Sequence, residues 1–117
     1  MAIVFVFGSN LAGIHGAGAA HEAARCWGAL VGQGIGPQGR SYAIPTKDEH
    51  IRTMTVDRIA PYVRDFVKYA AENPCDSFLV TAIGCGLAGH NPHDIAPLFV
   101  GATENVFLSE KLVAALR

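Results

Sequence analysis

The chain has 117 residues, half of them hydrophobic and 16% of them charged. This length suits one domain over residues 1–117, and this composition excludes a disordered chain. Nine Lys and Arg against ten Asp and Glu give a net charge of −1, which argues against nucleic-acid binding by bulk electrostatics. Binding of a small anionic ligand by local geometry is still compatible with this charge.

The three cysteines, Cys26, Cys75 and Cys85, are odd in number and lack paired spacing, so they do not indicate a disulfide framework. Residues 1–7 are apolar but carry no basic segment, which argues against a signal peptide. No apolar run approaches the 18 or so residues of a membrane span. We therefore expect a cytoplasmic protein without membrane contact, and a homo-oligomer stays open.

The first half of the chain alternates apolar runs with glycine-rich segments. Residues 3–7 form a continuous apolar run, which predicts a strand buried on both faces. A glycine-rich turn then leads to a predicted helix over residues 19–27. Five glycines in residues 28–39 predict an irregular loop. Residues 41–44 predict a second strand, which ends at Pro45.

A long polar connection over residues 46–57 precedes the strongest helix pattern, over residues 58–73. Pro61 falls in the first turn of this helix, where a missing N–H does least harm. The apolar residues recur at helical spacing and predict one buried stripe. They are Ile59, Tyr62, Val63, Phe66 and Ala70.

The third predicted strand, over residues 78–83, runs into a second glycine-rich loop at residues 84–89. Asn91 followed by Pro92 is typical of a helix start, because Asn caps free amides and Pro suits the first helical position. We expect Pro97 to limit this helix.

A fourth strand over residues 105–108 and a last helix over residues 109–116 complete the alternation. Strands and helices in this order predict an α/β fold with a mixed, mostly parallel sheet and helices on its faces. Ligands in such folds bind beyond the carboxyl ends of the strands. Both glycine-rich loops follow strands, so we expect the site there.

Residues 34–39, GIGPQG, match the dinucleotide fingerprint G-x-G-x-x-G by letter. That fingerprint needs a strand before it and a helix after it, whereas a strand follows here, so we reject the match. A Walker-type phosphate loop is also missing from the sequence.

Two other glycine segments are candidates for binding an anion. Residues 16–20 open a helix whose free N–H groups would face a ligand, and residues 84–89 could form a nest of successive amides. Each segment alone is equally compatible with a tight turn that binds nothing. Two such loops past strand ends favour a shared diphosphate site.

Reactive side chains give weaker indications. His90 and His93 with Cys85 are the one cluster that suggests a metal, but no second ligand pair has suitable spacing, so we expect no metal and no cofactor. Cys85 is interpreted as a small residue in a glycine loop rather than as a nucleophile with His90 as its base. Lys47 follows a strand end, where a solvated surface lysine is the interpretation that the sequence alone favours.

Three motifs taken together resemble the macrodomain family, most closely the branch that contains the terminal ADP-ribose glycohydrolase. Residues 15–20, HGAGAA, are similar to the MGAGIA loop of that branch, and residues 42–47, YAIPTK, to its strand ending in TK. Residues 83–87, IGCGL, are identical to its second loop, and the motifs occur in the family's order. Small macrodomain-like proteins of bacteriophages share a looser likeness in GSNLAG, GRSYAIPTK and IGCGLAG.

The resemblance implies a compact three-layer α/β/α fold that binds ADP-ribose or a derived nucleotide. The first glycine loop would approach the distal ribose and the second the diphosphate. Lys47 stands where the branch has a lysine that attacks the anomeric carbon of the sugar, whereas Ala88 stands where it has a catalytic aspartate. Asn10 either replaces a carboxylate that recognises adenine or matches a later asparagine, and both alternatives stay open.

Three functions are alternatives: a binding module for ADP-ribose-like nucleotides, a hydrolase that removes ADP-ribose from protein or nucleic acid, and a phage-type sponge for an immune signal made from NAD. Ala88 argues against the hydrolase, so we favour binding, in the host cytoplasm if the protein is phage-encoded. Lys47 is the candidate catalytic residue of the hydrolase alternative. The candidate ligand-binding residues are Gly8, Ser9, Asn10, Gly16, Ala17, Gly18, Ala19, Thr46, Lys47, Gly84, Cys85, Gly86, Leu87, Ala88 and Gly89.

Overall fold

Five strands form one mixed sheet in the computed structural model, which describes residues 1–117. The order of strands is β2-β3-β1-β4-β5, and neighbours pair in parallel except β2 with β3. The strands are β1 (Ile3–Asn10), β2 (Gly36–Gln38), β3 (Ser41–Lys47), β4 (Ser77–Val80) and β5 (Val106–Leu108). The α/β class and the mostly parallel sheet expected from the sequence are therefore confirmed.

Helices follow most of the strands, and polar side chains cap two of them. The hydroxyl oxygen of Thr55 accepts a hydrogen bond from the N–H of Arg58, and the side chain of Asn91 accepts one from the N–H of His93. Pro97 limits the third helix as expected, because the chain continues there as a 3-10 helix. The helices are α1 (Gly18–Cys26), α2 (Val56–Glu72), α3 (Pro92–Ile95), the 3-10 helix η1 (Ala96–Phe99) and α4 (Glu110–Ala115).

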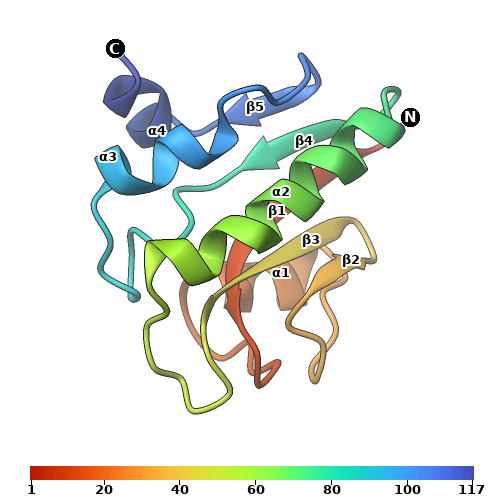
Figure 1. The fold of residues 1–117 in the computed structure, drawn as a ribbon. Coiled ribbons are helices and arrows are strands. Elements are labelled where there is room, and N and C mark those ends of the chain that lie inside the picture. The colour runs from red at the N-terminus through yellow and green to blue at the C-terminus, as the bar shows by residue number, and fades with distance from the viewer.

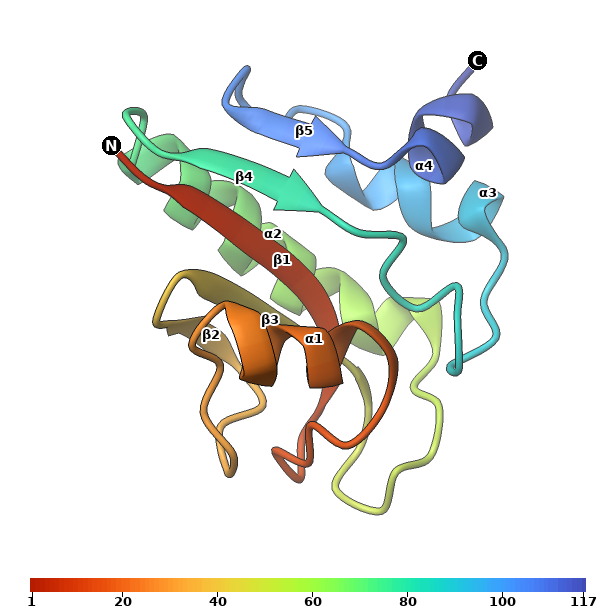
Figure 2. The same cartoon turned by 180° about the vertical axis from the view of Figure 1, so that it is seen from behind.

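Alternate residues of β1 face opposite sides of the sheet, and each side has its own apolar core. Val4 and Val6 face the side of α2, whereas Phe5 and Phe7 pack with the small residues of α1. Figures 1 and 2 show α2 and α1 on opposite faces of the sheet. The buried stripe of α2 consists of Ile59, Val63, Phe66 and Ala70, all predicted from their spacing.

The face of the sheet that carries α1 is covered only in part. α1 packs against β1 there, and no helix lies over the neighbouring β4 and β5 (Figure 2). Leu79 and Phe107 are consequently 41% and 53% exposed. They line a groove of about 350 Å³ with Phe5 and Trp27, whose rings stack 5.2 Å apart. A full three-layer arrangement stays a prediction for this half of the sheet.

Two strands are longer than the sequence suggested. β1 continues through Gly8 to Asn10, and β3 continues through Pro45 to Lys47. The two strands remain paired over this stretch because a register irregularity between Ser9 and Asn10 accommodates the proline, which has no N–H to donate. Lys47 therefore lies at the end of a strand beside Asn10.

Two further expectations are corrected. β4 ends at Val80 rather than at residue 83, and the carbonyl oxygen of Val6 there accepts both the last ladder bond, from the N–H of Thr81, and a bond from the Thr81 hydroxyl. The predicted loop over residues 28–39 contains β2, so the alternation of strands and helices has one extra strand. β2 is an edge strand, a position that tolerates its Pro37.

Candidate ligand-binding site

One cavity of about 550 Å³ lies beyond the carboxyl ends of β1, β3 and β4. Its volume is in the range of small-molecule sites, roughly 300–1,000 Å³. The walls come from the end of β1, the loop into α1, the end of β3, the loop after β4 and the first turn of α4. Because parallel strands end at the same edge, segments distant in the sequence meet here.

The structure brings all the candidate residues from the sequence to this cavity except Gly89. The N–H of Gly89 turns back to the carbonyl oxygen of Gly86 and closes the loop. The candidate residues named from the sequence did not include a second group of lining residues, of which Ala20 and Ile83 belong to the two glycine-loop motifs and the rest to segments without a recognised motif. They are Ile14, Ala20, Ile51, Thr81, Ala82, Ile83 and Lys111.

The loop after β4 presents unpartnered backbone donors to the cavity. The N–H groups of Gly84, Gly86, Leu87 and Ala88 donate no hydrogen bond within the chain, whereas that of Cys85 donates to the carbonyl oxygen of Ala82. Gly84 has a φ of 71°, a conformation that suits glycine. Closely spaced amides of this kind can hold an anion.

The first glycine loop adds the open N-terminus of α1. Ala17 stands at the capping position without a side chain that can accept a hydrogen bond, so the N–H groups of the first turn are not satisfied there. Gly18, Ala19 and Ala20 of this turn line the cavity, and Figure 2 shows the loop that leads from β1 into α1. Their small side chains leave the backbone accessible to a ligand.

The cavity is positively charged although the whole chain is not. Lys47 and Lys111 are the only charged residues that line it, and no Asp, Glu or His does. Neither lysine forms an ion pair, because the one ion pair of the structure joins His50 and Glu49. Both ammonium groups are therefore available to an anionic ligand.

The other polar side chains of the cavity use their donors within the protein. The Ser9 hydroxyl donates to the carbonyl oxygen of Gly34, and the Thr46 hydroxyl lies 3.4 Å from the carbonyl oxygen of Ser9. The Thr81 hydroxyl donates to Val6 over 2.8 Å. A ligand consequently meets backbone amides and two lysines as its hydrogen-bond donors.

Asn10 lines the cavity and also holds the loop after β1. Its Nδ2 donates to the carbonyl oxygen of Ile14 over 2.8 Å, and its Oδ1 accepts from the N–H of Ile14 over 3.0 Å. Both functional groups of the side chain are thus engaged by one residue. One N–H and one lone pair of this amide remain free, so both alternatives that the sequence left open for Asn10 remain predictions.

Residues 28–39 support this loop from behind. His15 is buried, and its Nε2–H donates to the carbonyl oxygens of Leu30 and Gln33 at 2.9 and 3.1 Å. The N–H of Gly32 donates to the carbonyl oxygen of Gly13 over 2.8 Å. The GIGPQG motif thus belongs to a segment that braces the binding loop, and no helix follows it.

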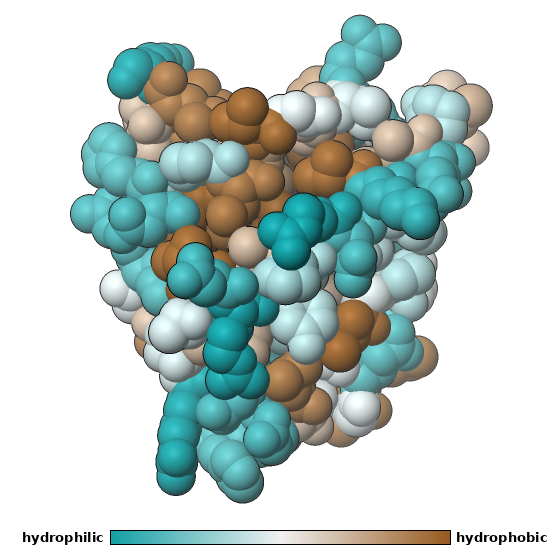
Figure 3. All heavy atoms as spheres, viewed as in Figure 1, coloured by the Kyte–Doolittle hydropathy of each residue, from teal (hydrophilic) through white to brown (hydrophobic).

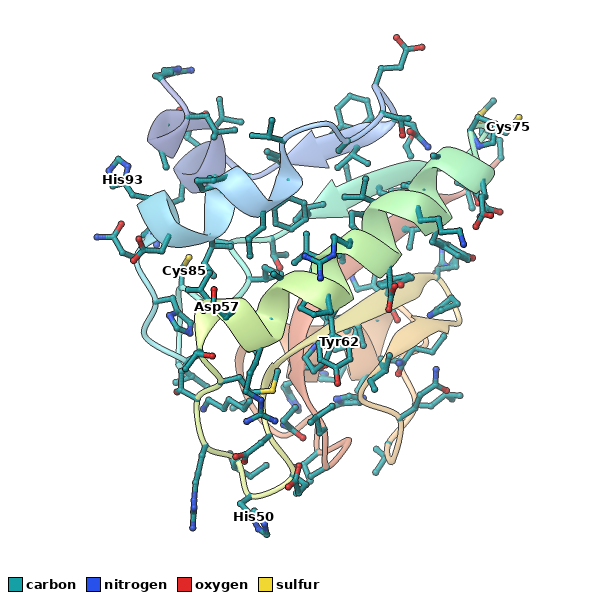
Figure 4. All side chains as sticks on the ribbon, viewed as in Figure 1. His50, Asp57, Tyr62, Cys75, Cys85 and His93 are labelled. Atoms are coloured by element: carbon teal, nitrogen blue, oxygen red, sulfur yellow. The ribbon has the colours of Figure 1, made fainter.

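Cys85 lies in the second loop, with its thiol 3.4 Å from the carbonyl oxygen of Ile83 (Figure 4). Burial raises the pKa of the Cys85 thiol, and the positive charge of Lys111 only partly offsets this rise. A raised pKa disfavours the thiolate that a nucleophile needs. The interpretation of Cys85 as a small loop residue agrees with this environment.

The histidines do not gather around the cavity. Nε2 of His90 donates to the carbonyl oxygen of Met54 over 2.7 Å, and His93 points outward from α3 (Figure 4). Neither they nor Asp94 line the cavity. No group of three His, Cys, Asp or Glu residues is arranged to hold a metal ion.

Comparison of the chain with protein-family models, with curated protein sequences and with solved structures finds no match. None of the helices combines the length and the apolar character that crossing a membrane requires.

Proposed function

We propose that the cavity binds ADP-ribose or a nucleotide derived from it, with the diphosphate on the backbone amides of the second glycine loop. The protein would act by holding this ligand, as a phage-type sponge for a signal made from NAD would. The likeness of HGAGAA, YAIPTK and IGCGL to macrodomain motifs supports this choice of ligand.

The observation that carries the proposal is the charge and donor pattern of one cavity. The residues of four unpartnered amides in residues 84–88 and two unpaired lysines line a space without any acidic side chain. Backbone amides and a helix N-terminus stabilise phosphate groups without requiring a basic protein surface. A diphosphate fits this pattern, whereas the two lysines would repel a cationic metabolite.

An ADP-ribosyl hydrolase with Lys47 as its nucleophile is the second candidate, because Lys47 lines the cavity. Such a reaction also needs a group that gives a proton to the leaving group and activates water. The lining residues offer no carboxylate and no histidine for these steps. Binding therefore accounts for the site better than turnover.

Isothermal titration calorimetry with ADP-ribose, its cyclic forms and base-modified relatives tests the proposal. We expect saturable binding with a dissociation constant of about 1–10 µM, equivalent to roughly 7–8 kcal/mol. Mass spectrometry of small molecules released from the purified protein by heat should identify a co-purified nucleotide. An absence of binding to every one of these ligands at millimolar concentration would overturn the proposal.

A further inference from the structure

Three large hydrophobic side chains surround the mouth of the cavity. Ile14, Ile51 and Leu87 come from three different loops, and all three line the cavity. They are nevertheless 56%, 41% and 72% exposed. Apolar side chains gathered around an opening and left uncovered by the protein are suited to contact the apolar part of a ligand.

Ile51 is held in a strained conformation. It is the only residue other than glycine with a positive φ, at 62°. This region is unfavourable for a β-branched side chain, and such strain persists only where the surrounding structure enforces it. Ile51 is also the one apolar residue in the segment from Asp48 to Arg52, in a part of the molecule where hydrophilic side chains gather (Figure 3).

The side chain of Asp48 enforces this conformation. Its carboxylate accepts hydrogen bonds from the N–H groups of His50 and Arg52, at 2.8 and 3.0 Å. The N–H of Ile51 donates to the carbonyl oxygen of Asp48 over 3.1 Å. The N–H of Asp48 donates to the carbonyl oxygen of Arg52 over 2.8 Å. The two hydrogen bonds to the carboxylate, first that from Arg52 and then that from His50, hold the pKa of Asp48 below its usual value.

The loop that carries Ile51 is fixed to the wall of the cavity. Lys47 and Thr53 form an antiparallel bridge at its base, and the Thr53 hydroxyl donates to the carbonyl oxygen of Ala88 over 3.0 Å. Leu87, which precedes Ala88, extends toward the first glycine loop, where its Cδ1 lies 3.8 Å from the place of a Cβ on Gly18. The apolar mouth is therefore preformed.

We propose that Ile14, Ile51 and Leu87 hold the flat ring of the bound nucleotide by its faces, and that the site accepts nucleoside diphosphates with little regard to the base. The inference rests on the proposed nucleotide binding and goes beyond it. Telling adenine from guanine or hypoxanthine requires donors and acceptors aimed at the edge of the ring. The hydroxyls of Ser9, Thr46 and Thr81 donate within the protein, and Asn10 uses one N–H and its oxygen on Ile14, so the side chains of the cavity offer few free groups to the edge of a ring.

Titrations of ADP-ribose and of its hypoxanthine and guanine counterparts, with inorganic pyrophosphate beside them, test base tolerance. The three nucleotides should bind within about threefold of one another, and pyrophosphate at least about tenfold more weakly, because it cannot use the apolar mouth. A preference of tenfold or more for adenine would overturn the inference and leave nucleotide binding intact. Equal affinity for pyrophosphate would show that the three apolar side chains do not contribute to binding the nucleotide. Failure of every nucleotide to bind would overturn the proposed function itself.

Substitutions at Ile51 provide a second test. Ile51→Ala should weaken all three nucleotides to the same extent, by about tenfold, whereas Ile35→Ala, at an exposed isoleucine outside the cavity, should change none. Ile51→Gly should raise the melting temperature, because glycine tolerates this φ, and still weaken binding. Unchanged affinity in Ile51→Gly would contradict the proposal, since a merely structural residue would alter stability alone.

Asp48 supplies a test of preorganisation. Asp48→Ala removes the acceptor that fixes the loop and should weaken the three nucleotides equally. Asp48→Asn keeps an oxygen for the N–H groups of His50 and Arg52 and should restore most of the affinity. Affinity in Asp48→Ala equal to that of the natural protein would show that the loop need not be held for binding.

Discussion

Gly34 lies so close to Asn10 that a β-carbon on the glycine would overlap the carbonyl oxygen of Asn10. The segment over residues 28–39 and the loop after β1 are therefore packed backbone against backbone. Ser9, which precedes Asn10, donates its hydroxyl to the carbonyl oxygen of Gly34 in the same contact. The position of the first glycine loop thus depends on a segment that does not itself line the cavity.

Gly34→Ala should lower the free energy of unfolding by about 2–3 kcal/mol, because backbone on both sides must move to admit the methyl group. Urea unfolding followed by circular dichroism measures this loss. Gly86→Ala is the control, since its Cβ would meet nothing within 4 Å and its φ is not left-handed. Equal stability of the two variants would show that the close contact is not tightly packed in solution.

Gly86→Val tests whether the second glycine loop holds the ligand. The added side chain has open space in the protein but occupies the cavity that Gly86 lines. We expect a native far-UV spectrum together with a loss of ADP-ribose affinity of about tenfold or more. Ala71→Val, on the exposed surface near the end of α2, should leave affinity unchanged. A folded Gly86→Val with full affinity would place the ligand elsewhere.

Lys111 should contribute charge to the site although no motif marks it. Lys111→Gln removes one of the two lysines of the cavity and should weaken ADP-ribose by a factor of about 3 to 10. The dependence of affinity on salt should decrease with it, because screening acts on this attraction. Lys68→Gln, on the exposed surface of α2, is the matched control. An unaltered salt dependence in Lys111→Gln would exclude contact between Lys111 and the anionic ligand.

The sequence was sufficient to predict the main strands and the glycine-rich part of the cavity. Continuous apolar runs mark β1, β3 and β4, and the loops after β1 and β4 carry the glycines that approach the ligand space. These signals are local, so they can be interpreted without knowing the order of strands. Their convergence at one edge of the sheet follows from parallel pairing alone.

The features that the sequence did not reveal depend on contacts between distant segments. β2 has only three residues, one of them Pro37, and owes its existence to pairing with β3. Lys111 reaches the site because β5 pairs with β4 and ends at the same edge. The uncovered face around Phe107 results from a short α1 that packs on β1 and on Ala43 of β3 rather than over β4 and β5, which no periodicity in the sequence predicts.

Alkaline pH should destabilise the protein through Tyr42. Burial raises the pKa of Tyr42 to about 12 from 10.0, and the negative charge of Asp65 adds to this rise. The unfolded chain would ionise this phenol first, so the stabilising contribution is complete below pH 10 and is lost as the pH rises toward 12. The loss should reach at most about 2–3 kcal/mol. Tyr42→Phe should therefore show a flatter pH dependence of the unfolding free energy between pH 9 and pH 12, and identical slopes in the two proteins would contradict this account.

Lys47 distinguishes a binder from an enzyme. An amine that attacks the anomeric carbon must be neutral, and the bond that breaks needs a proton for its leaving group. Ala88 supplies no such proton, and neither His90 nor Asp94 lines the cavity. We therefore expect Lys47 to contact ligand oxygens, so that Lys47→Ala weakens ADP-ribose binding by about tenfold.

The corresponding activity assay uses a peptide ADP-ribosylated on glutamate and ADP-ribosylated DNA, each in excess over the protein, with release of ADP-ribose followed by chromatography. We expect little or no released ADP-ribose, because a binder cleaves no bond and a covalent adduct would keep ADP-ribose on the lysine. Multiple turnovers that Lys47→Ala abolishes would overturn the binding role and establish the hydrolase. A single covalent adduct on Lys47, detected by intact-protein mass spectrometry, would show that the lysine can attack and that only the step needing a second carboxylate is lost. Adding Ala88→Asp to such a protein should then restore turnover, because it returns a carboxylate to the loop that faces the cavity.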